Sequence, residues 1–210
     1  MRPEGGQVTD SARRPAPLFA TEPALIPGAA PDPDIMEAKP MRSRRSNGHG
    51  LGEDLIKGAI AGAVATWVMG KLTGAMYQRE DRGARRHEDA ARRGKTSYGV
   101  LAEKTAGAMG TTLDDRTRER YGAALHWALG VGAGALYAVV RRRFGAVGRA
   151  AGVGFGTMFW AAVDEGLVPA LGLTPGPRAF PWQAHARGLA GHLTFGTVTD
   201  GTLRLLDQVA

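Results

Sequence analysis

The chain contains a stretch of twenty residues, from Tyr121 to Val140, that carries no Asp, Glu, Lys or Arg. A helix of about 20 apolar residues is long enough to cross the roughly 30 Å hydrocarbon layer of a bilayer. Tyr121 stands at one end and Arg141–Arg143 follow the other, as aromatic and basic residues do at membrane interfaces. A helix of a soluble bundle would instead show a charged face with helical spacing. The stretch therefore predicts a membrane-spanning helix.

Three further apolar segments accompany it, near residues 55–77, 150–173 and 183–206. Lys57 and Lys71 border the uncharged centre of the first segment, and their long side chains can extend to the lipid headgroups. We therefore predict an all-α fold, a multi-pass transmembrane bundle of about four membrane helices within residues 51–207. The alternative is a soluble four-helix bundle, which the uncharged twenty-residue stretch disfavours.

Residues 1–50 carry 8 of the 12 prolines and show no apolar periodicity. Such a composition cannot bury enough apolar surface to offset the entropy that is lost on ordering. We predict that this Pro-rich, basic segment is a disordered N-terminal tail. Met36 and Met41 each precede a plausible alternative start, which leaves open whether residues 1–40 belong to the native protein.

Residues 78–120 form a charged loop between the first two apolar segments, with 11 basic and 8 acidic side chains. Apolar residues recur at helical spacing from Tyr98 to Met109, which predicts a surface amphipathic helix. The net charge is +7, but acidic residues interleaved with the basic ones argue against a nucleic-acid surface. The expected partner is the lipid bilayer, and the basic residues on both sides of the bundle leave its orientation open.

Glycines recur four positions apart in the first three apolar segments. Helices in lipid associate through close backbone contact, which glycine permits. The predicted helix-packing positions are Gly58, Gly62, Gly130, Gly134, Gly152 and Gly156. These faces are compatible with packing inside one chain or with a homo-oligomer, and a membrane scaffold built on them is one alternative function.

Ionisable residues stand inside the apolar segments, where they are costly and usually face a bundle interior or a water-filled cavity. They are His126, Asp164, Glu165, His185 and His192. Histidine takes up a proton near neutral pH, and a neighbouring carboxylate favours its charged form. We predict a proton-responsive cluster of His126, His192 and either Glu165 or Asp164. The alternative is that these groups only satisfy one another's hydrogen bonds. Pro169 predicts a kink or helix end just beyond them.

The pattern predicts no catalytic residue, no cofactor and no metal site. The chain has no cysteine, and it lacks a Walker loop, an HExxH motif and a recognisable nucleophile–base pair. His185 and His192 are seven residues apart, about 10 Å along a helix, which is too far to share one metal ion easily. A non-enzymatic protein is favoured, with a membrane-bound metal protein or enzyme that uses the same cluster as the alternative.

Three stretches resemble the YagU-like family of bacterial inner-membrane proteins. One is LHWALGVGAGALY (Leu125–Tyr137), in which a histidine is followed by spaced glycines and a tyrosine. Another is GFGTMFWAAVDEGLVPALGLTP (Gly154–Pro175), in which a Gly-rich helix leads to acidic residues and a proline, and the last is HARGLAGHLTFGTVTD (His185–Asp200). The resemblance covers roughly residues 54–207. It implies a small multi-pass inner-membrane protein with no assigned reaction.

Overall fold

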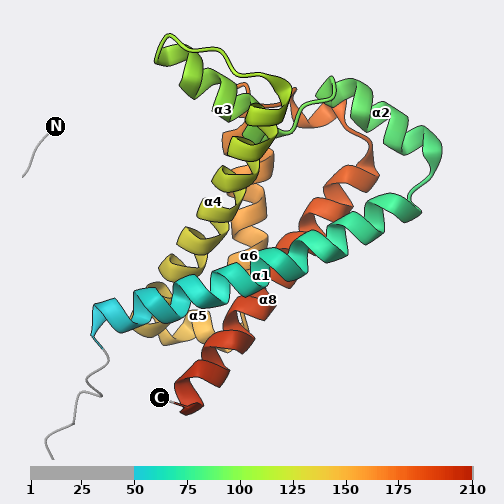
Figure 1. Ribbon diagram of the computed structural model, residues 1–210. Coiled ribbons are helices and arrows are strands. Elements are labelled where there is room, and N and C mark those ends of the chain that lie inside the picture. Colours follow the sequence, from blue (N-terminus) through green and yellow to red (C-terminus); the bar gives the residue numbers. More distant parts are fainter. Residues whose placement is uncertain (1–49, 210) are drawn as a thin grey trace, which may run out of the picture. The chain divides into compact units, whose positions relative to one another are not determined.

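The computed structural model describes residues 50–209, which fold into helices joined by short turns (Figure 1). The long helices are α1 (Leu51–Arg79), α4 (Asp115–Arg143) and α8 (Trp182–Val209). The shorter ones are α2 (Arg82–Arg92), α3 (Ser97–Ala108), α5 (Gly145–Arg149), α6 (Val153–Phe159), the π-helix η2 (Trp160–Leu167), α7 (Val168–Ala170) and the 3-10 helix η3 (Pro177–Ala179). This range contains no strand, so the predicted all-α class is confirmed. The predicted disordered tail lies outside the described residues.

The predicted apolar segments correspond to α1, α4, α8 and a composite helix. That composite is α6, η2 and α7 in direct succession, and it ends at Ala170, one residue after Pro169. The predicted surface helix is α3. The charged loop also contains α2, so it is more helical than its mixed charges indicated.

Side-chain caps explain where the helices of the charged loop begin. Asp81 accepts hydrogen bonds from two backbone N–H groups at the start of α2, and Thr96 accepts one from Gly99 at the start of α3. Asp114 accepts one from the Thr117 N–H at the start of α4. Such caps satisfy N–H groups that have no partner within the helix.

Two of the described helices, α1 and α4, are long and apolar enough to cross a membrane, with mean hydropathy of 1.3 and 1.6 in their most apolar windows. The prediction of about four membrane helices is therefore supported in part, because two of the described helices qualify as candidate spans. Only 28% of each window is buried inside the bundle. Most residues of these two windows are thus half-buried or exposed in the bundle.

Glycine allows α1 and α4 to cross with their backbones in contact. A Cβ atom built on Gly58 would lie 2.6 Å from the Ala135 Cα and from the Gly134 carbonyl oxygen. One built on Gly62 would lie 2.5 Å from the Gly130 carbonyl oxygen. The predicted packing glycines of these two helices therefore face each other within one chain.

The remaining predicted glycines bring α6 against α8. A Cβ atom on Gly156 would overlap the His192 carbonyl, and one on Gly152 would overlap the Gly196 carbonyl. Gly152 also has a φ of 78°, in the left-handed region that favours glycine. This position thus needs glycine both for the turn into α6 and for the close contact with α8.

Figure 1 shows α1 crossing α4 and α8, with α2 and α3 at one end of the bundle and α5 at the other. The glycine contacts join the N-terminal half of α1 to the C-terminal half of α4. Tyr137 and Phe195, both fully buried, fill the space between these helices, α6 and α8. Beyond that packed region the helices diverge toward the end that carries α2 and α3.

Replacing Gly134 with alanine tests the contact between α1 and α4. The new Cβ would lie 2.5 Å from the Gly62 Cα, and forcing an extra methyl group into packed backbone typically costs about 1–3 kcal/mol. The matched control is Gly132→Ala on the same helix, where a Cβ meets nothing within 4 Å. Thermal unfolding in detergent should show a lower midpoint for Gly134→Ala and an equal or higher one for the control. Equal midpoints for the two variants would refute the contact.

Candidate functional site

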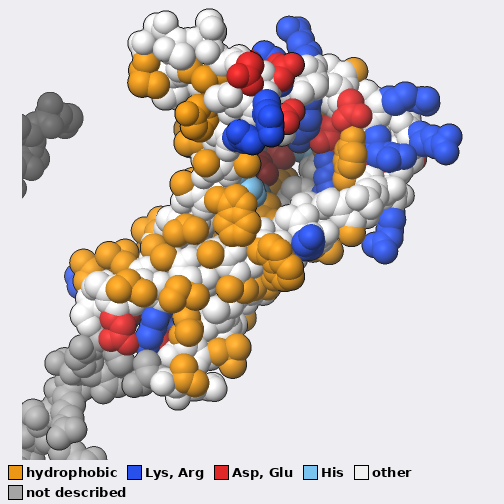
Figure 2. All heavy atoms as spheres, viewed as in Figure 1, with side chains coloured by type: hydrophobic (Ala, Val, Ile, Leu, Met, Phe, Trp, Pro, Cys, Tyr) orange, Lys and Arg blue, Asp and Glu red, His pale blue; other side chains and the backbone are white. Residues whose placement is uncertain are grey.

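A cavity of about 430 Å³ lies at the end of the bundle where α2 and α3 are found. Its walls come mainly from α1, α3, α4, η2 and α8, with further residues from α2, α6 and α7. All five ionisable residues singled out in the sequence line it: His126, Asp164, Glu165, His185 and His192. Figure 2 shows histidine and acidic atoms at the base of a hollow between an apolar band and a charged region. The structure thus brings together residues that lie up to 66 positions apart in the chain.

The π-helix η2 directs its two acidic residues to different histidines. Glu165 Oε1 lies 2.6 Å from His185 Nδ1, and Asp164 Oδ2 lies 3.6 Å from His192 Nδ1. Neighbouring residues on a helix point in different directions, so each carboxylate has its own partner. The predicted cluster left the acidic partner of His192 open, and in the structure that partner is Asp164. Single π turns within longer helices are frequent at functional sites.

His185 lies between two hydrogen-bond acceptors. Its Nδ1 faces the Glu165 carboxylate at 2.6 Å, and its Nε2 faces the Pro177 carbonyl oxygen at 3.0 Å. A neutral imidazole has one N–H and cannot donate to both. The two hydrogen bonds coexist only when the pair carries one more proton, on the ring or on the Glu165 carboxyl group. The structure thus places a hydrogen-bond acceptor at each ring nitrogen of His185.

His192 is buried, with 5% of its surface exposed, and uses one nitrogen within the fold. Its Nδ1 lies 3.0 Å from the Gly188 carbonyl oxygen, which requires this nitrogen to donate. In the part of the chain that the structure describes, no residue hydrogen-bonds its Nε2. A neutral His192 therefore offers Nε2 as an acceptor at the cavity wall.

Three further polar groups of the wall, on His126, Tyr98 and Trp160, lack hydrogen-bond partners among residues 50–209. The His126 ring packs against the Tyr98 ring with centroids 5.0 Å apart, and neither side chain has a hydrogen bond. Burial, and then the charge of Asp164, raise the pKa of Tyr98 to about 12, so its hydroxyl stays protonated. The indole Nε1 of Trp160 is buried without a partner. Buried polar groups normally have hydrogen-bond partners, so the cavity is suited to bind a polar solute.

The five ionisable residues do not lie close enough together to form a metal site. Within residues 50–209 no three His, Asp or Glu side chains are grouped as metal ligands would be. The carboxylates instead divide between two separate histidine partners.

A set of ion pairs at the cavity rim was not foreseen from the sequence. The buried Arg187 donates to Glu80 and, at 2.5 Å, to Glu88, and its guanidinium lies 5.0 Å from the centre of the Tyr77 ring. Glu88 also accepts from Arg92 at 2.8 Å, and Arg92 lines the cavity. Within the predicted segment 183–206, Arg187 is the one Lys or Arg before Arg204. This isolated charge in an apolar segment was the signal that could have identified it.

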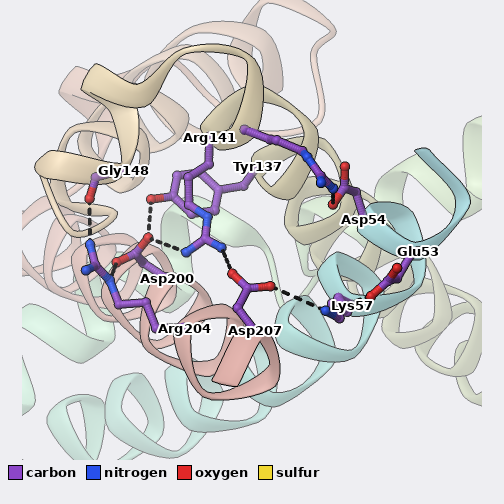
Figure 3. Close-up of polar contacts among 10 residues, drawn as sticks. Glu53, Asp54, Lys57, Tyr137, Arg141, Gly148, Asp200, Arg204 and Asp207 are labelled. Atoms are coloured by element: carbon purple, nitrogen blue, oxygen red, sulfur yellow. Dashed lines mark hydrogen bonds and ion pairs between the residues drawn. The ribbon is translucent and has the colours of Figure 1, made fainter. Parts of the chain in front are cut away.

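A second polar cluster occupies the opposite end of the bundle (Figure 3). Asp200 on α8 is 1% exposed, and its carboxylate accepts from the Tyr137 hydroxyl at 2.9 Å and from Arg204 at 2.6 Å. Arg141 completes an ion pair with it at 3.4 Å. Arg204 also donates to the Gly148 carbonyl oxygen at 2.7 Å, which ties α8 to α5.

Figure 3 also shows the charged residues around this cluster. Arg141 contacts Asp207 as well as Asp200, and Lys57 of α1 lies 2.8 Å from Glu53 and 3.5 Å from Asp207. The cluster therefore joins α1, α4 and α8 at this end. Asp200 was not singled out in the sequence, although it directly follows residues 188–199, a part of the fourth segment that has no Asp, Glu, Lys or Arg. Its groups are satisfied, unlike those of the cavity, so it serves stability.

Replacing Asp200 with alanine should be strongly destabilising. Removing one partner of a buried ion pair typically costs about 3–5 kcal/mol because the other partner is left uncompensated. Arg204→Ala is the control, since its side chain is 54% exposed and exposed pairs contribute about 1 kcal/mol or less. Denaturant unfolding in detergent measures both. Equal losses for the two variants would show that Asp200 is not the centre of the cluster.

Comparison with known proteins gives one match. The family model described as "Protein of unknown function (DUF1440)" matches residues 97–201, half of the chain. That range runs from α3 into α8 and includes all five ionisable residues of the cavity as well as Asp200. Searches of curated proteins and of solved structures gave no match, and the YagU-like resemblance stays a prediction. The chain belongs to the DUF1440 family of proteins of unknown function.

Proposed function

We propose that this protein is a multi-pass protein of the bacterial inner membrane whose cavity responds to pH by binding and releasing protons. The observation that carries the proposal is the placement of His185 between two acceptors, an arrangement that requires one additional proton in its pair with Glu165. The membrane location and the proton role rest on separate observations and are tested separately.

The exposed surface of α1 supports the membrane location. Large apolar side chains form a continuous outward stripe: Ile56, Ile60, Val64 and Trp67, which are between 41% and 64% exposed. Their spacing of three to four residues places them on one face of the helix. Monomeric soluble proteins rarely expose apolar patches of this extent. Lipid is the environment in which such a face is stable.

The distribution of charge supports the same location. Figure 2 shows a band of apolar side chains with many charged residues beyond its upper end and a few near its lower end. Glu53, Asp54 and Arg142 belong to one end, and the charged residues of α2 belong to the other. In this arrangement α8 and the α6–η2–α7 helix accompany the two candidate spans, and α2 and α3 lie at the membrane surface.

Proton binding is favoured over the alternative functions. The scaffold alternative required glycine faces free for another copy, but the six predicted glycines contact neighbouring helices of the same chain. A metal protein would need ligands that converge, and the described histidines and acids do not. Two His–carboxylate pairs that line one cavity are the arrangement that a proton-responsive site requires.

Membrane fractionation tests the location. The full-length protein should stay in the membrane pellet after high-salt and alkaline carbonate washes and should be released by detergent, because its apolar helices lie in the hydrocarbon layer. Release by either wash would mean that the helices do not span the bilayer. The proton proposal would then lose its membrane setting.

NMR of selectively labelled protein tests the bound proton. At pH 7, either the ¹⁵N signals of His185 should report two protonated ring nitrogens, or the ¹³C signal of the Glu165 carboxyl should report the acid. Glu165→Gln, which removes the charge that holds the proton, should leave His185 with one N–H. His87 is the control, because it is exposed on α2 and lies outside the cavity. A neutral His185 beside an ionised Glu165 at pH 5 to 7 would overturn the proposal.

A further inference from the structure

The cavity wall presents more hydrogen-bond acceptors than donors. Asp164 receives no hydrogen bond from any described residue, because the nearby His192 Nδ1 donates to the Gly188 carbonyl oxygen instead. His192 Nε2 and one nitrogen of a neutral His126 are further acceptors, as is the hydroxyl oxygen of Tyr98. A solute that satisfies these groups must bring several N–H or O–H donors.

The charge of the wall favours a cation. The charge of Glu165 is balanced by the extra proton that its pair with His185 holds, and the charge of Arg92 is balanced by Glu88. Asp164 is the remaining charged group of the wall, and His126 and His192 add no charge while neutral. When Asp164 is ionised, the cavity therefore carries one uncompensated negative charge.

Aromatic side chains line the same cavity as this carboxylate. Phe159 stacks edge-on against His192 with ring centres 5.4 Å apart, and Tyr98, Trp160 and Phe180 also line the cavity. Aromatic faces attract cations, most strongly where water is excluded. A carboxylate within aromatic walls is thus suited to an organic cation more than to a strongly hydrated inorganic ion.

We infer that the cavity binds a small primary alkylammonium ion, with its –NH₃⁺ group at Asp164. The three N–H donors of such a group match the carboxylate, His192 Nε2 and one acceptor from either His126 or Tyr98. The buried Trp160 N–H is a donor for a hydroxyl or carbonyl oxygen elsewhere on the same solute. The position beside Gly188 is tightly bounded, since a Cβ there would lie 3.1 Å from Trp160 Nε1 and 3.6 Å from Asp164 Oδ2.

This inference rests on the proposed function, because protons and the ammonium ion compete for the same wall. The titratable and charged groups that line the cavity together with Asp164 come from several elements: Arg92 from α2, Tyr98 from α3, His126 from α4, Glu165 from η2, and His185 and His192 from α8. Protonation of His126 or His192 would add positive charge beside the bound cation and remove an acceptor. Uptake of protons should therefore release the ammonium ion.

Calorimetry on the full chain in detergent tests the inference, with propylammonium as the probe. Propanol and propionate are the comparison compounds, because they keep the size and remove or reverse the charge. We expect binding of propylammonium at pH 8 and no binding of the other two. Binding at pH 5.5 should be at least about tenfold weaker, since imidazoles ordinarily protonate near pH 6.5.

Two variants locate the site, each with a matched control. Asp164→Asn should weaken binding about tenfold or more, the loss expected for a hydrogen bond to a charged group, whereas Asp115→Asn on the exposed surface should not. Gly188→Ala should weaken binding by narrowing the site, whereas Gly132→Ala should not. Thermal unfolding shows whether each variant is folded. If Asp164→Asn is not folded, Asp164→Glu, which keeps the charge, serves as the second variant.

The outcomes separate this inference from the proposed function. No binding of propylammonium, equal binding of propanol, or unchanged binding in Asp164→Asn would overturn the ammonium site even where NMR reports the proton at His185. Binding that is the same at pH 5.5 and pH 8 would overturn the competition with protons. Binding that has the expected pH dependence, and that Asp164→Asn and Gly188→Ala abolish but their controls do not, would support both the ammonium site and its competition with protons.

Discussion

The backbone contact between α1 and α4 is the constraint on which the rest of the structure depends. With Gly58 and Gly62 against Gly130 and Gly134, the two helices touch in one half of the bundle and must separate in the other. Helices in lipid have no hydrophobic force between them, so in a membrane close contacts of this kind carry much of the association. The cavity lies where the helices separate, and its wall begins at Thr66, one turn beyond the last glycine contact on α1.

The two ends of the bundle use polar residues differently. At the α5 end, the Asp200 carboxylate has a tyrosine hydroxyl and two arginines as partners, and α8 is held to its neighbours. At the α2 end, the buried Trp160 indole N–H and the half-buried Asp164 carboxylate lack hydrogen bonds among the described residues. Unsatisfied buried groups destabilise a fold, so a fold that keeps them together in one cavity is consistent with a binding role.

Much of the fold could be predicted because hydropathy acts locally. The positions of α1, α4 and α8 follow from runs of apolar residues, and that of α3 from the spacing between Tyr98 and Met109. The ionisable residues of the cavity were recognised because charge within an apolar run is costly wherever the run is placed. The pairing of Asp164 with His192 and of Glu165 with His185 could not be predicted, because it depends on the widened turn of η2.

The sequence by itself determined that the chain is helical, that α1 and α4 are apolar enough to lie in a membrane, and that a small set of histidines and acids lies within apolar surroundings. Each of these follows from the composition of a single segment. The tertiary structure alone decided which carboxylate meets which histidine, that Arg187 and Asp200 anchor opposite ends of α8, and that the five ionisable residues share one cavity. These features depend on contacts between residues far apart in the chain, and no local pattern specifies the crossing of the helices that brings them together.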